Sequence, residues 1–155
     1  MNDLQPLLTL LAQAESERDA ALAHSQRQDA AERTAQAQAD QLLGYRRDYE
    51  ARWGEHFSRS AKIELLHCYQ GFIERLNQAI DQQARTAAHA ANQAAIASAE
   101  LREAELRVAS VRKLIERRVG ELQLREDKRE QKQGDEFAAR VAWQRLSTFG
   151  SLPAR

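Results

Sequence analysis

The sequence predicts an all-α protein, a long antiparallel two-helix coiled-coil hairpin with an overhanging C-terminal helix. The 155 residues are 43% hydrophobic and 30% charged, with only six glycines and two prolines, a composition typical of long helices. Apolar residues recur at alternating spacings of three and four, as coiled coils require. One short segment alone combines a helix stop with a helix start. We therefore expect a single domain over residues 1–155.

The first helix is predicted over residues 4–53, with Pro6 in its first turn, where a missing N–H is tolerated. A 3-4 spacing from Leu4 selects fifteen positions, about ten of them apolar. These are Leu4, Leu7, Leu11, Ala14, Arg18, Ala21, Ser25, Gln28, Glu32, Ala35, Ala39, Leu42, Arg46, Tyr49 and Trp53. The pattern is weak from Arg18 to Glu32, so the register can drift there.

The loop is predicted over residues 54–60. Gly54 suits the left-handed position that ends many helices, and Ser58 or Ser60 can cap the next helix. A fold about residues 58–59 pairs positions whose numbers sum to roughly 117, such as Tyr45 with Phe72.

The second helix is predicted over residues 61–146, followed by a disordered tail over 147–155. Its 3-4 positions, about fourteen of sixteen apolar, are Leu66, Tyr69, Ile73, Leu76, Ile80, Gln83, Ala87, Ala90, Ala94, Ala97, Leu101, Ala104, Val108, Val111, Ile115 and Arg118. Such a long unbroken register favours a coiled coil over a globular helix. This helix should overhang the first over residues 112–145.

Composition and charge exclude several classes of function. Lys and Arg number 23, as do Asp and Glu, so the chain lacks the positive surplus that nucleic acid binding needs. The longest uncharged stretch, residues 86–99, is short and contains polar side chains, so we expect no direct membrane insertion. The single cysteine, Cys68, rules out an internal disulfide and is typical of a reducing cytosol.

No pattern of catalytic or metal-binding residues is present. The four histidines do not stand at helical ligand spacing from one another or from Cys68, and no glycine-rich phosphate loop occurs. We therefore expect no cofactor, no metal and no enzymatic activity.

Apolar residues near the loop exceed what a two-stranded seam needs. Two series with matching spacing lie there, Gln38, Leu42, Tyr45 and Tyr49 on the first helix and Phe72, Leu76, Ala79 and Gln83 on the second. They can thicken the seam or form an exposed docking stripe for another protein. We favour the stripe, because these aromatic side chains cannot all face one narrow seam.

Three segments resemble the flagellar FliJ family, small cytoplasmic components of the type III export apparatus. They are residues 41–49 (QLLGYRRDY), 69–80 (YQGFIERLNQAI) and 130–140 (EQKQGDEFAAR). The resemblance covers nearly the whole chain at matching order and length. Gly134 and Gln83 depart from the family pattern, which has a better helix former at the first position and tolerates a basic residue or His at the second.

The resemblance implies a hairpin similar to the rotor shaft of F-type ATP synthases. It implies that the end with the termini enters the ring of the flagellar export ATPase and that the protein contacts the export-gate membrane protein FlhA and export chaperones. The implied gate-binding residues are Gln38, Leu42, Tyr45, Tyr49, Phe72, Leu76, Ala79 and Gln83. The implied ATPase-binding residues are Leu7, Leu11, Gln131, Lys132, Asp135, Glu136, Phe137 and Arg140.

The implied location is cytoplasmic, with peripheral association at the inner membrane at the flagellar base. Two alternatives stay open on the sequence. The chain can be the cognate stalk component of a virulence type III secretion system, or a generic structural coiled-coil spacer that dimerises.

Overall fold

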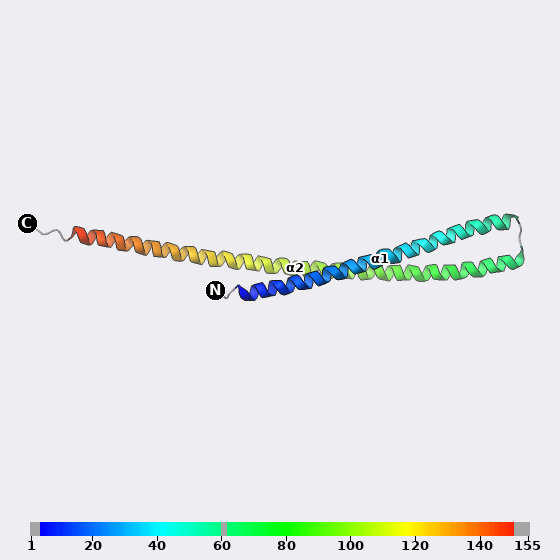
Figure 1. Ribbon diagram of the computed structural model, residues 1–155, viewed down its shortest axis with the longest axis horizontal. Coiled ribbons are helices and arrows are strands. Elements are labelled where there is room, and N and C mark those ends of the chain that lie inside the picture. The colour runs from blue at the N-terminus through cyan, green and yellow to red at the C-terminus, as the bar shows by residue number, and fades with distance from the viewer. Residues whose placement is uncertain (1–3, 60–61, 151–155) are drawn as a thin grey trace, which may run out of the picture. The chain divides into compact units, whose positions relative to one another are not determined.

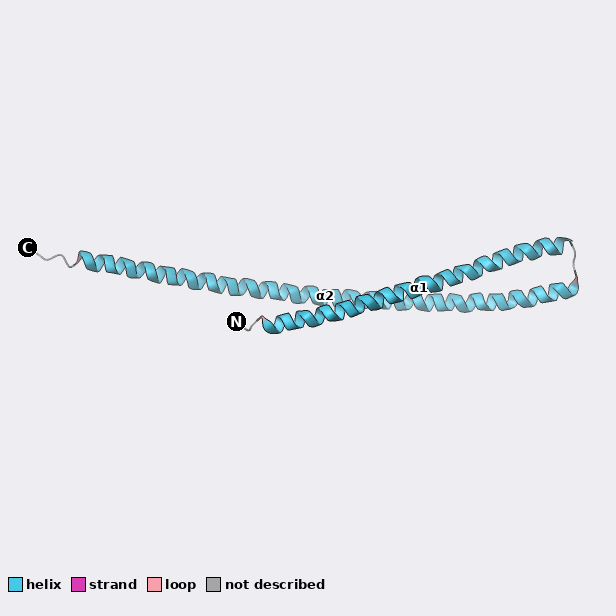
Figure 2. Cartoon of the chain, viewed as in Figure 1, coloured by secondary structure: helices cyan, strands magenta, loops and turns pink. Residues whose placement is uncertain are grey.

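The computed structural model describes residues 4–59 and 62–150. Two helices make up this part of the chain, α1 (Gln5–Arg59, 55 residues) and α2 (Ile63–Phe149, 87 residues) (Figures 1 and 2). They pack against each other in opposite directions, and no described residue lies in a strand. The predicted all-α helical hairpin is thus confirmed.

The chain divides into two compact units, residues 14–107 and residues 1–13 together with 108–155. Each unit contains one stretch of α1 and one stretch of α2. Both helices run unbroken from one unit into the other. The single hairpin domain expected over residues 1–155 stays a prediction.

In the unit of residues 14–107, the seam follows the predicted 3-4 register. The side chains on this seam are buried or half-buried at every predicted position of α1 in this unit, including the polar ones between Arg18 and Glu32. Ser25 is 5% exposed, and Ala97 of α2 is 1% exposed. Small side chains therefore occupy the centre of the seam here, where they allow the two helix backbones to approach closely. Of the predicted α2 positions in this unit, Leu66 alone is exposed.

The pairing register differs from the prediction by about one helical turn. Gln83 of α2 contacts Gln38 of α1, and Phe72 contacts Tyr49. In both pairs the residue numbers sum to 121, whereas the pairing predicted from the sequence sums to roughly 117. Tyr49, and not Tyr45, therefore lies against Phe72.

The register shifts because α1 continues past the predicted stop. Gly54 lies inside α1, and no glycine of the described residues has a positive φ. Ser58 does not cap the next helix, since its hydroxyl donates a hydrogen bond of 2.7 Å to the carbonyl of Glu55 within α1. The predicted end at residue 53 and loop at 54–60 were wrong, while Ser60 and Ala61 lie outside the described residues.

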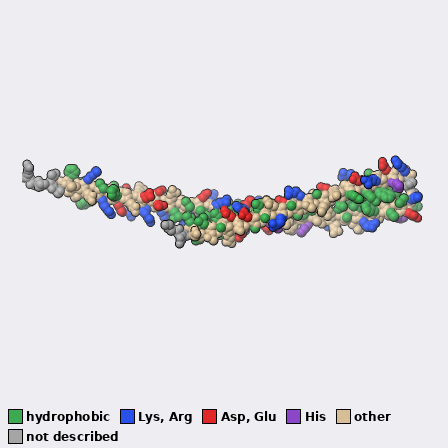
Figure 3. Space-filling model, viewed as in Figure 1, with side chains coloured by type: hydrophobic (Ala, Val, Ile, Leu, Met, Phe, Trp, Pro, Cys, Tyr) green, Lys and Arg blue, Asp and Glu red, His purple; other side chains and the backbone are tan. Residues whose placement is uncertain are grey.

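Aromatic packing explains why α1 runs through Gly54. The ring of Phe57 lies 5.2 Å from that of Trp53 and 5.4 Å from that of Tyr69 on α2. A helical glycine costs about 1 kcal/mol relative to alanine, and burial of one aromatic side chain exceeds this cost. We call Tyr49, Trp53, Phe57, Tyr69 and Phe72 the aromatic cluster. Hydrophobic side chains gather on this end of the molecule in Figure 3.

In the second unit, the first turns of α1 pack against α2. Pro6 and Leu7 share an open pocket with Leu114, and Leu4 shares another with Glu126. Glu126 is the last residue of α2 that lines a pocket with the start of the described chain, so we take the overhang as residues 127–149. The predicted overhang began too early, at residue 112, because the register shift carries α1 further along α2. The predicted disorder from residue 147 was also wrong, since α2 ends at Phe149. Residues 151–155 lie outside the described residues.

Candidate protein-binding surfaces

The two series predicted near the loop lie on adjacent helices of the unit of residues 14–107. The side-chain amide of Gln83 donates hydrogen bonds of 3.2 Å to the side-chain oxygen of Gln38 and to the carbonyl of Ala35. The rings of Tyr49 and Phe72 lie 4.4 Å apart. Counting along both helices from these two contacts places Leu42 opposite Ala79 and Tyr45 opposite Leu76. The structure thus brings all eight predicted residues into one band.

Only part of this band faces outward. Leu76 is 8% exposed and belongs to the seam, whereas Tyr45 is 58% exposed. Gln38 and Ala79 are exposed as well, and the remaining members are half-buried. The structure thus divides the band into residues that pack in the seam and residues that face solvent, and binding of another protein by the exposed ones stays a prediction. Leu76 and the inner faces of Tyr49 and Phe72 thicken the seam, and Tyr45 with its exposed neighbours is accessible to a partner.

The aromatic cluster extends this band toward the loop. Tyr49 stacks against Tyr69 at 6.2 Å and lies 6.0 Å from Trp53. Sequence reasoning placed Tyr49, Trp53 and Tyr69 on the seam but missed Phe57, because the helix was expected to end before it. The spacing of four from Trp53 to Phe57 was the available signal.

Burial also changes the acidity of one member of the cluster. Desolvation of the Tyr69 hydroxyl raises its pKa above the ordinary value of 10.0, and the charges of Glu50 and Tyr49 act in the same direction. A few residues away along the seam, the guanidinium of Arg46 donates a hydrogen bond of 3.0 Å to the side-chain oxygen of Asn77. Such a bond satisfies a cation that occupies an apolar seam position.

The residues predicted for the ATPase form two separate groups in the second unit. Leu7 and Leu11 are half-buried against α2. The other six are all exposed on the overhang, namely Gln131, Lys132, Asp135, Glu136, Phe137 and Arg140. Leu7 lies near Leu114, and Gln131 follows Leu114 by 17 residues, which is about 25 Å along a helix. The structure therefore does not gather the eight residues into one patch.

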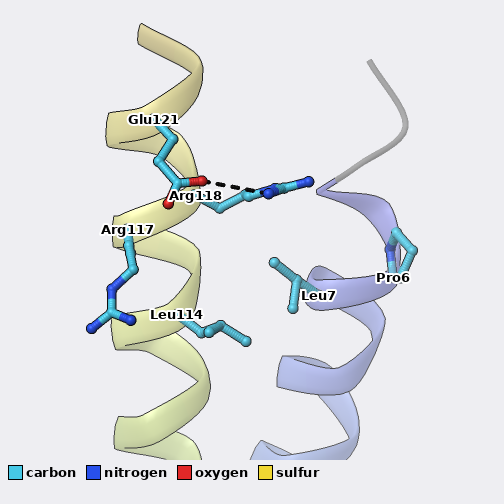
Figure 4. Close-up of a pocket in the computed structure, with 6 residues that line it drawn as sticks. All are labelled: Pro6, Leu7, Leu114, Arg117, Arg118 and Glu121. Carbon is cyan, nitrogen blue, oxygen red and sulfur yellow. Dashed lines mark hydrogen bonds and ion pairs between the residues drawn. The ribbon is translucent and has the colours of Figure 1, made fainter. Parts of the chain in front are cut away.

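An open pocket of about 390 Å³ marks the beginning of α1. Figure 4 shows Leu7 and Leu114 pointing toward each other between the helices. At its rim, Arg118 forms an ion pair of 3.4 Å with Glu121. This pair satisfies the charge at the last predicted seam position of α2, so the pocket is chiefly an apolar contact between two helices.

The overhang also exposes large apolar side chains beyond the predicted set. Trp143 is 74% exposed, and Leu146 and Phe149 are similarly exposed. Phe149 could not be singled out from the sequence analysis, because the helix was expected to end at residue 146. Large apolar groups in a row on an unaccompanied helix mark a protein contact more often than isolated ones do.

The described residues show no other kind of site. No group of three or more His, Cys, Asp or Glu residues in residues 4–59 and 62–150 could hold a metal ion. No helix in the same ranges is both long and apolar enough to cross a membrane.

Comparison with known proteins adds the family. Residues 1–147 match the family model described as flagellar FliJ protein. Neither a curated protein nor a solved structure matches the chain. The match spans nearly the whole helical hairpin, including both candidate surfaces. The chain therefore belongs to the flagellar FliJ protein family and is a component of flagellar type III protein export.

Proposed function

We propose that this chain binds and stimulates the flagellar export ATPase ring through the unit that holds the termini. We further propose that it contacts the export gate FlhA through the band near the loop and handles export chaperones. It would act at the cytoplasmic side of the inner membrane at the flagellar base. The observation that carries the proposal is the family match over residues 1–147, which covers both surfaces.

The ATPase part draws support from the overhang. In the described part of the chain, residues 127–149 have no second helix beside them, so α1 does not cover their large apolar side chains. Phe137 and Trp143 are exposed there. Entry into a ring would bury these side chains and stabilise the helix. The flanking charges, such as Lys132 and Glu136, would then steer association more than they stabilise it.

The gate part draws support from the exposed portion of the band near the loop. Tyr45 is accessible on a rigid two-helix surface, and tyrosine is enriched among residues that dominate binding energy. Gln38 and Gln83 beside it offer hydrogen-bonding groups at the rim. Leu76 would support this surface from beneath, because it lies in the seam.

The chaperone part rests on the family resemblance alone. Membership of the flagellar family favours the flagellar apparatus over a virulence secretion system. A generic coiled-coil spacer would need no exposed aromatic residues at either end, and light scattering would detect the dimer that such a spacer forms.

Purified chain mixed with the cognate export ATPase tests the first part. We expect co-elution and faster ATP hydrolysis, and weaker stimulation by the Phe137→Ala/Arg140→Ala variant. Leu106→Ala is the matched control, since Leu106 is an exposed apolar residue outside both surfaces. Unchanged hydrolysis without co-elution would remove the ATPase function.

Binding of the cytoplasmic part of the export gate tests the second part. We expect Tyr45→Ala to weaken binding by at least about tenfold, as loss of an interface anchor does. Ile96→Ala, another exposed position on the same unit, should leave binding unchanged. Equal binding by both variants would exclude the band as the gate surface.

A further inference from the structure

The 3-4 spacing of the α2 seam continues into the overhang, past the N-terminus of α1. Continuing the 3-4 spacing from Leu122 selects Arg125, Arg129, Lys132, Glu136, Ala139, Trp143 and Leu146, which we call the seam extension. All seven are exposed. At 100° per residue they lie within an arc of about 100°. The overhang thus presents a continuous face in line with the intramolecular seam.

The first half of the seam extension is basic. Arg125, Arg129 and Lys132 occupy three consecutive seam positions, and none of them forms an ion pair within the described part of the chain. A helix that packed on this half with an apolar seam would desolvate three cations without compensation, which is costly. A stable partner must therefore bring carboxylates to these positions.

The second half of the seam extension is apolar. Ala139, Trp143 and Leu146 follow Glu136 at seam spacing, and Trp143 is 74% exposed. A Trp beside a small residue forms the kind of knob and hole that a second helix fills. Trp is also among the residues most often found at the energetic centre of an interface.

We propose that the seam extension binds an acidic amphipathic helix of another protein. That helix continues the coiled coil past the N-terminus of α1, with carboxylates against the basic half and apolar side chains against the apolar half. Continuity with the existing seam and charge complementarity both carry this assignment. The proposal rests on the proposed function and deepens it, because Lys132, Glu136 and Trp143 of this face belong to the overhang proposed to enter the ATPase ring. It adds the chemistry of the segment that this face binds, and peptide binding tests it independently of ATP hydrolysis.

A second copy of the chain fits this face poorly. Parallel pairing would place Arg125 against Arg125 of the copy and repeat this repulsion at the two following seam positions. Antiparallel pairing in full overlap would place Arg125 opposite Leu146 and Lys132 opposite Ala139, which leaves the cations desolvated. Neither arrangement supplies carboxylates at the required positions.

Two synthetic peptides of three heptads test the proposal on the full chain. The acidic peptide carries Glu at the positions that face Arg125, Arg129 and Lys132, and Leu at those that face the apolar half. The basic peptide carries Lys in place of Glu. By fluorescence anisotropy, we expect the acidic peptide to bind more than about tenfold tighter than the basic one, because like charges across an interface are strongly unfavourable. Equal binding, or none, would overturn the proposal.

Charge reversal tests whether the peptide binds at the seam extension. The Arg125→Glu/Arg129→Glu/Lys132→Glu variant should bind the basic peptide and should no longer bind the acidic peptide. Arg27→Glu/Arg33→Glu/Arg85→Glu makes the same change in net charge at exposed positions elsewhere and should keep the original preference. Circular dichroism verifies folding, and if the reversed variant is unfolded, the peptide preference of the native chain decides.

The Trp143→Ala/Leu146→Ala variant tests the apolar half separately. It should bind the acidic peptide at least about tenfold more weakly than the native chain does. Unchanged binding would overturn the proposed two-part interface. Phosphatidylglycerol vesicles serve as a second probe. If they bind the chain through Arg125, Arg129 and Lys132 while the acidic peptide does not, the face belongs to a membrane surface and the helix proposal is wrong.

Discussion

Tyr49 of α1 lies against Phe72 of α2, with ring centroids 4.4 Å apart and planes inclined by 35°. This contact joins the helices at the loop end of the band proposed to bind the export gate. The two residues therefore contribute to the stability of the hairpin as well as to its surface. Tyr45, stacked on Tyr49 at 6.5 Å from the same helix, lies further out.

Alanine substitutions should distinguish the residues that stabilise the hairpin from those that only form its surface. Tyr49→Ala and Phe72→Ala should each lower the free energy of unfolding by about 1–3 kcal/mol, less than for fully buried rings. A double-mutant cycle should give a coupling of about 0.5–1.5 kcal/mol. Tyr45→Ala should change stability by less than about 0.5 kcal/mol. Urea unfolding measures all four, and equal losses at Tyr45 and Tyr49 would contradict the assigned burial.

Gly54→Ala should stabilise the protein by about 0.5–1 kcal/mol, because alanine is the better residue inside a helix. A Cβ at this position meets no atom within 4 Å. Thermal unfolding followed by circular dichroism measures the change. If α1 instead ended at a left-handed Gly54, the substitution would lower the melting temperature.

Ala97→Leu should destabilise the unit of residues 14–107 by about 1–3 kcal/mol, the usual cost of overpacking. Ala97 is buried at the close approach of the helices, whereas Ala95 is exposed. Ala95→Leu is therefore the matched control and should leave the denaturant midpoint nearly unchanged. A gain in stability from Ala97→Leu would mean that the seam is looser than described.

Tyr69 should make stability depend on pH in the alkaline range. Its pKa is raised in the folded chain, so the folded state keeps the phenol proton at pH values where the unfolded chain loses it. The resulting stabilisation is present below a pH of about 10 and is lost as pH rises through the folded-state pKa. The unfolding free energy of wild type should therefore fall more steeply above this pH than that of Tyr69→Phe. If the unfolding free energies of both proteins fell equally steeply with pH, the raised pKa of Tyr69 would be contradicted.

The seam was predictable because its signal is periodic. Alternating spacings locate a coiled-coil face even where individual residues are polar, and Ser25 and Gln28 keep their places in the register. The band near the loop was found for the same reason, since its two series share one spacing and stay opposite each other in any register near the observed one.

The end of α1 was not predictable from local signals. Gly54 and Ser58 favour a stop, but the contacts of Phe57 with Trp53 and Tyr69 outweigh them. These contacts exist only once α2 has returned beside α1, so no local pattern contains them. The error in the pairing sum and in the start of the overhang followed from this one misplaced loop.

The hairpin itself is tested most directly by an intramolecular distance between Gln38 and Gln83, with Cys68→Ser as the background for spin labelling. Unlabelled chain in excess suppresses distances between molecules. The account predicts a short distance, of the order of the 8–10 Å spacing of packed helices plus the label arms. A distance near 70 Å, about what 45 residues span in one continuous helix, would contradict it.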